Sequence, residues 1–198
     1  MTDATRPLPL AGQAQWGAAL LLALAMICTR GQHFAALNAL PSASWAVFFL
    51  AGALLRPVWM LPALFLLSSL LDIGSLAAGG FGDWCLSPAY WALALAYAAL
   101  WLGGQVYARR LHDGSWRSAP RLALVLVASA SVAYLLSKGG FYFFSGRYPD
   151  ADLAGFLARV PRYYPRALGT LAGYAGAGVL LAVLWQRLAA RQPRGAAA

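Results

Sequence analysis

Long apolar stretches separated by short clusters of charge dominate the chain. Stretches such as AALLLALAMI and ALVLVASA lack the polar–apolar alternation that is typical of membrane β-barrel strands. They approach the roughly 20 apolar residues with which an α-helix crosses a bilayer, and a helix satisfies its own backbone groups in lipid. The positions of the charges predict six membrane-spanning helices in a single domain of residues 1–198, at 12–29, 42–55, 57–78, 86–108, 120–137 and 167–187.

The composition supports an all-α membrane protein. Hydrophobic residues make up 61% of the chain and charged residues 11%, whereas soluble domains carry roughly 25% charge. The mean hydropathy is +0.62. The net charge of +9 comes without a basic run interleaved with exposed aromatic residues, so a nucleic-acid partner is not expected.

The distribution of lysine and arginine predicts the topology. With six spans, nine of the 15 basic residues fall on the side of the termini and six on the other, and the short connection RRLHDGSWR alone holds three arginines. The positive-inside rule then places both termini in the cytoplasm of a bacterial inner membrane, with the lipid bilayer as surroundings. The first apolar stretch, which lacks a cleavage site of signal-peptide type, is predicted to be a retained helix.

The segment 139–166 is too polar to span a membrane and unusually rich in aromatic residues. Its residues 152–160 predict a short amphipathic helix at the outer interface, which Pro161 and Pro165 would end. Two interpretations stay open with equal weight. The segment is either a lid over an outward-facing pocket or a belt of interfacial tyrosines.

No nucleotide-binding, hydrolase or zinc motif is present, and the remaining polar chemistry gathers on the predicted outer side. Cys85 lies where the fourth helix is expected to begin, so the helix dipole would favour its thiolate, a soft ligand for transition metals. Three alternatives stay open for Cys85: a small buried hydrophobe, a disulfide with Cys28, or a redox centre.

An acid at the end of an apolar run, as Asp72 is, indicates function by default, although it is equally an Asp that has already reached the interface. His33 and Tyr90 carry a weaker signal, because a lone histidine is commonly a satisfied polar residue and a tyrosine commonly packs. Both residues are predicted on the same side of the membrane as Asp72 and Cys85, and this strengthens the prediction that all four residues belong to one site.

The strings Thr29-Arg30 with His33, LPSASWAVFFLAG and LDIGSLAAGGFGDWCLSPAYW resemble the BtuM family of cobalamin transporters. That family is similar to the substrate-binding S-components of energy-coupling-factor (ECF) vitamin transporters. The resemblance implies an S-component-like bundle of about six helices with an outer loop or short helix between helices 5 and 6. It also implies binding of cobalamin, vitamin B12, from the periplasmic side.

The resemblance makes Cys85 the axial ligand of the corrin cobalt, and places His33, Asp72 and Tyr90 in the same pocket, with Arg159 as its arginine. It implies a transporter first, and leaves open a decyanation of bound cyanocobalamin with Cys85 as the catalytic residue. Cobalamin would be the bound substrate, with no other cofactor, and an ECF energising module a partner that docks on small residues of the first helix.

Two other classes of function stay open. The chain is alternatively an S-component for a different vitamin, in which Cys85 only packs. It is alternatively a membrane thiol-redox or assembly protein, in which Cys28 and Cys85 exchange thiols. Cobalt and a corrin absorption spectrum in the purified protein would indicate a cobalamin transporter, and the absence of both would favour one of the other two classes.

Overall fold

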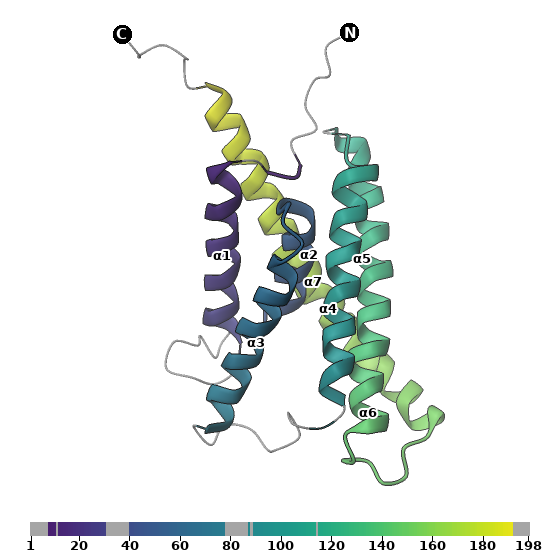
Figure 1. Cartoon of the computed structure of the whole chain (residues 1–198). Helices are drawn as coiled ribbons and strands as arrows, with labels where there is room; N and C mark the ends of the chain where they lie inside the picture. The colour runs from purple at the N-terminus through teal and green to yellow at the C-terminus, as the bar shows by residue number, and fades with distance from the viewer. Residues whose placement is uncertain are drawn as a thin grey trace.

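The computed structural model describes residues 8–10, 12–30, 40–77, 87, 89–113 and 115–191, which form helices and connecting loops without a strand. The all-α prediction is thereby confirmed for this part of the chain. In Figure 1 the long helices lie side by side and alternate in direction, so that α1 begins and α7 ends at the same end of the molecule. In order, the helices are α1 (Gln13–Thr29), α2 (Ser44–Leu54), α3 (Met60–Ala77), α4 (Ala89–Val106), α5 (Ala119–Tyr134), α6 (Gly140–Phe144) and α7 (Leu153–Arg191).

Helix α2 is the centre of the bundle. It is apolar on all sides, as expected of a buried helix, and every residue except Trp45 is buried. It packs against α1, α3, α4 and α7. Its contact with α4 is the closest of these, because Cβ atoms placed on Gly52 and Gly104 would collide with backbone carbonyl groups of the facing helix. This contact stacks Phe48 on Tyr97, with ring centroids 4.0 Å apart, and so fixes Tyr97 beside the start of α2.

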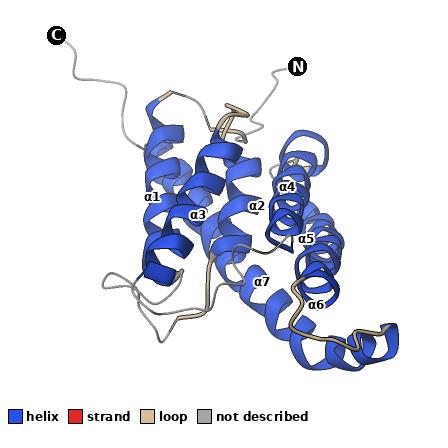
Figure 2. Cartoon of the chain, turned by 60° about the horizontal axis from the view of Figure 1, so that its bottom comes forward, coloured by secondary structure: helices blue, strands red, loops and turns tan. Residues whose placement is uncertain are grey.

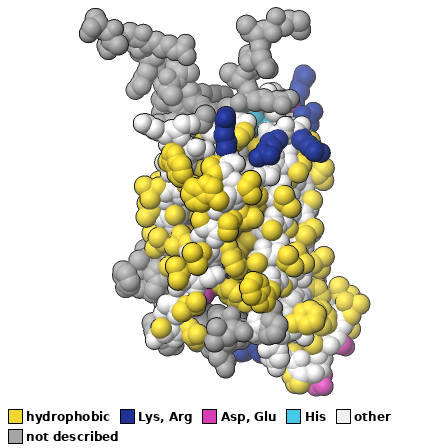
Figure 3. Space-filling view, viewed as in Figure 1, with side chains coloured by type: hydrophobic (Ala, Val, Ile, Leu, Met, Phe, Trp, Pro, Cys, Tyr) yellow, Lys and Arg dark blue, Asp and Glu magenta, His cyan; other side chains and the backbone are white. Residues whose placement is uncertain are grey.

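The outer surface of the bundle is strongly apolar. Large side chains on four different helices are more than half exposed, among them Leu21 (68%), Leu66 (59%), Trp91 (74%) and Leu124 (70%). Figure 3 shows this apolar belt below an end that carries several lysine or arginine side chains. Exposed apolar surface of this extent marks a contact with protein or membrane.

Two helical segments are long and apolar enough to cross a membrane, Met60–Ala77 and Ala119–Phe144, the second of which runs from α5 through a π-helical turn (Leu135–Gly139) into α6. Helices α1 and α2 are apolar but shorter, with 17 and 11 residues. The structure therefore agrees with membrane association, whereas the count of six crossings stays a prediction.

The predicted end of a helix at the two prolines is wrong. Instead of a separate helix over 152–160, α7 continues through Pro161 and Pro165 as one helix of 39 residues, which Figure 2 shows extending from the side of α6. A proline inside a helix removes one hydrogen bond and crowds the preceding turn. Packing along the helix compensates, because Phe156 lies in an aromatic cluster before the prolines, Tyr164 packs against the main core between them, and Leu171 is buried in that core after them.

Candidate ligand-binding site

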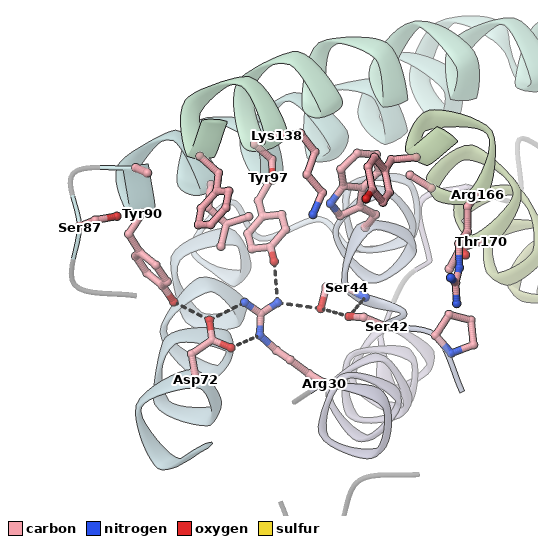
Figure 4. A pocket seen from close by; sticks show the side chains of 18 residues that line it. Arg30, Ser42, Ser44, Asp72, Ser87, Tyr90, Tyr97, Lys138, Arg166 and Thr170 are labelled. Carbon is pink, nitrogen blue, oxygen red and sulfur yellow. Dashed lines mark hydrogen bonds and ion pairs between the residues drawn. The ribbon is translucent and has the colours of Figure 1, made fainter. Parts of the chain in front are cut away.

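A cavity of about 510 Å³ lies between the helices, toward the end where α1 finishes and α2 begins. Its volume falls within the range of ordinary small-molecule sites, roughly 300–1,000 Å³. Aromatic side chains form much of its wall, and Figure 4 shows the polar groups that face it. Those polar residues include Arg30, Ser42, Ser44, Asp72, Tyr90, Lys138 and Arg166.

A buried ion pair forms one wall of the cavity. Arg30, directly after the last residue of α1 and only 8% exposed, donates from Nε to Oδ1 of Asp72 at 2.8 Å and from Nη2 to Oδ2 at 2.6 Å. This bidentate geometry is the strong form of an arginine–carboxylate contact. It joins the end of α1 to α3 and neutralises the acid that the sequence singles out.

The same arginine also holds α2 and α4. Its Nη1 donates to Ser44 Oγ at 2.8 Å and to Tyr97 Oη at 2.5 Å. From the other side, Tyr90 Oη donates to Asp72 Oδ2 at 3.0 Å. The network is therefore satisfied at both charges, which makes this wall rigid.

Two further cations face the cavity, Lys138 and Arg166. Within the described ranges neither has a hydrogen bond or ion pair to a protein group, and Asp72 is the only acid among the described residues that line the cavity. Because Arg30 cancels the charge of Asp72, the described lining carries two uncompensated positive charges.

The structure brings two of the predicted site residues together, since Asp72 and Tyr90 are hydrogen-bonded to each other at the cavity. His33 and Cys85 lie outside the described residues. Ser87, two positions after Cys85 in the sequence, lines the cavity.

Arg159 is placed elsewhere. Its guanidinium lies over the rings of Tyr142 and Tyr148, at 5.3 and 4.6 Å from their centroids, and it is absent from the described cavity lining. Another arginine of the same helix, Arg166, faces the cavity instead.

Sequence reasoning missed Lys138 and Arg166, which it used only as markers of topology. It also missed Ser44 and Tyr97 as partners of Arg30. Both residues lie directly beside a predicted span, Lys138 after the fifth and Arg166 before the sixth, where a basic residue is also the ordinary signal of topology. Within the described part of the chain, Cys28 has a free, half-buried thiol, and no three potential metal ligands come together.

Comparison of the chain with protein-family models and with curated proteins gives no match.

Proposed function

We propose that the chain is a multi-pass protein of a bacterial inner membrane that binds cobalamin in this cavity for uptake. The observation that carries the proposal is the cavity itself, which gathers Asp72 and Tyr90 at one end of an apolar bundle. These two residues match pocket positions of the family that the sequence resembles, and Ser87 connects the cavity to the sequence neighbourhood of Cys85.

The apolar belt supports the membrane part of the proposal. Leucine and tryptophan side chains face outward on α1, α3, α4 and α5, where a soluble protein would place charge. The alternating directions of the helices are compatible with six crossings. The residues that line the cavity lie toward the helix ends opposite the arginine-rich α4–α5 connection. With the positive-inside rule, that end faces the periplasm.

The chemical character of the lining supports a ligand with a flat ring and polar edges. Flat apolar surfaces come from Trp45, Tyr97, Phe141 and Tyr163, and the same lining offers hydrogen bonds from serine, tyrosine and charged groups. A corrinoid has this combination: a broad ring, amide arms and a cobalt ion with axial positions. A thiolate from Cys85 would supply that cobalt with a soft axial ligand.

Coordination by Cys85 is a ligand exchange. The Cys85 thiol loses its proton to solvent, a bond forms between its sulfur and cobalt, and the axial group already on cobalt leaves with its electron pair. When the starting ligand is cyanocobalamin, the leaving group is cyanide and the oxidation state of cobalt is unchanged. Binding should therefore release a proton and alter the visible spectrum of the corrinoid.

The test is a spectroscopic titration of the detergent-purified protein with cyanocobalamin. Wild-type protein is expected to bind with a shifted spectrum and to release cyanide, and Cys85→Ser to lose both effects because it substitutes a hard, protonated oxygen of similar size. Cys28→Ser is the matched control and should behave as wild type. A Cys85→Ser protein that gives the wild-type spectrum would exclude the sulfur as ligand, and no binding by wild-type protein would refute the function.

A further inference from the structure

Two cations that line the cavity, Lys138 and Arg166, have no acidic partner among the described residues. Arg30 and Asp72 neutralise each other through two hydrogen bonds, whereas Lys138 and Arg166 face the cavity without a described protein partner. Other described acids, Asp113, Asp150 and Asp152, do not line it. Both side chains are exposed at the cavity and have no acidic partner among the described residues, so they are available to a ligand that brings negative charge.

The local structure aims these residues at the cavity. Lys138 lies in the π-helical turn Leu135–Gly139, and its neighbours Ser137 and Phe141 line the same cavity. Such turns within α-helices recur at functional sites because they reorient side chains. Figure 4 shows the amine of Lys138 pointing toward the interior of the pocket.

Helix α7 supplies the second cation from a different direction. Tyr163, Arg166 and Thr170 all line the cavity, and their spacing of three and four residues places them on one face of the helix. Figure 4 shows Arg166 alongside Thr170 on the wall away from Asp72. The lining of the cavity thus includes two cations and several hydroxyl groups, and arginine in particular suits the recognition of phosphate.

We propose that Lys138 and Arg166 form an anion subsite that binds the phosphodiester of the ligand. This inference rests on the proposed function. The phosphodiester that joins the nucleotide loop to the ring system is the anionic group of cobalamin, and cobinamide lacks it. The subsite therefore selects corrinoids that carry a complete nucleotide loop.

The experiment compares the dissociation constants of cobalamin and cobinamide for wild-type protein, Lys138→Met and Arg166→Gln. Wild-type protein is expected to prefer cobalamin, and each variant to lose about ten- to hundredfold of that preference, as expected for one charged hydrogen bond. Affinity for cobinamide should stay nearly constant. Lys138→Arg keeps the charge and should retain the preference, which separates loss of charge from misfolding.

Arg162→Gln is the matched control. Arg162 lies one turn before Arg166 on α7 and is exposed, as Arg166 is. Its guanidinium lies near the ring of Tyr163, but Arg162 is not among the described residues that line the cavity. This variant should leave the preference for cobalamin unchanged.

The outcomes distinguish the subsite from the function. Equal wild-type affinities for both corrinoids, or a preference unchanged in the Lys138→Met/Arg166→Gln double variant, would overturn the subsite and leave the function standing. Phospholipid that co-purifies with wild type and is lost from the double variant, with the corrinoid preference unchanged, would assign the cations to a lipid headgroup and likewise overturn the subsite.

If wild-type protein binds neither corrinoid, the proposed function fails and inorganic phosphate decides the subsite. Thermal protection by phosphate over chloride at equal ionic strength, present in wild type and absent in the double variant, would support it. Equal protection of both proteins would overturn it.

Discussion

Removing the carboxylate of Asp72 should destabilise the fold even without ligand. Asp72→Ala deletes both acceptors of the bidentate pair and leaves Arg30 with Ser44 and Tyr97 as partners. Breaking a buried ion pair from one side costs about 3–5 kcal/mol, because the other charge stays buried. The side chains of Arg30 and Asp72 are 10% and 15% exposed beside a cavity, so water limits the loss to the lower end, about 3 kcal/mol.

A loss of that size corresponds to a decrease in Tm of about 6–12 °C for a chain of this length. The assay is reversible denaturant unfolding in detergent, without ligand, for Asp72→Ala, Arg30→Met and the double variant Arg30→Met/Asp72→Leu. The double variant should be more stable than the sum of the single losses predicts, since replacing both charges removes the unpaired ion. A coupling free energy below about 1 kcal/mol would refute the reasoning, because that is the value of a solvent-exposed pair.

Three further predictions concern other parts of the molecule. Gly104→Ala should destabilise strongly, by at least about 2 kcal/mol, because the added methyl group meets the backbone of α2, whereas Gly173→Ala on α7, with open space at its Cβ, should be neutral or stabilising in the same unfolding assay. Burial lowers the pKa of His112 in the α4–α5 connection, so the folded state favours the neutral imidazole. The stability that this residue contributes is present above its unfolded pKa of about 6.5 and is lost as the pH falls below that value. His112→Gln should therefore flatten the dependence of Tm on pH between about 7 and 5. A periplasm-active reporter inserted in the loop 145–152 should be active, and the same reporter in the α4–α5 connection inactive; the reverse pattern would invert the proposed orientation.

Sequence patterns located the helices because uncharged runs are long and the charges fall between them. The predicted spans 12–29 and 42–55 correspond to α1 and α2 within about two residues at each end. The failure at Pro161 and Pro165 has a physical cause. Prediction from local sequence counts the hydrogen bonds that a helix loses at a proline. The packing of Phe156 and Tyr164, which compensates for those lost hydrogen bonds, depends on residues that are distant in the sequence.

The sequence indicated which residue types stand out as candidates for the site, but not which residues pair with each other there. Asp72 stood out because an acid ends an apolar run, but its partner Arg30 lies 42 positions away and nothing in a single sequence connects the two. Arg166 was equally hidden, since a basic residue beside a predicted span is also the ordinary signal of topology. Which arginine of α7 faces the cavity depends on the rotation of the helix, and that rotation is set by its packing.

The position of Arg30 has a consequence for biosynthesis. Its three partners follow it by 14, 42 and 67 residues, and so emerge from the ribosome in that order. At about 5–20 residues per second, Tyr97 is made roughly 3–13 s after the arginine. A newly made first helix therefore ends in a cation that water or lipid headgroups must solvate until the third and fourth helices arrive. This wall of the cavity can therefore form only once about half of the chain has been made.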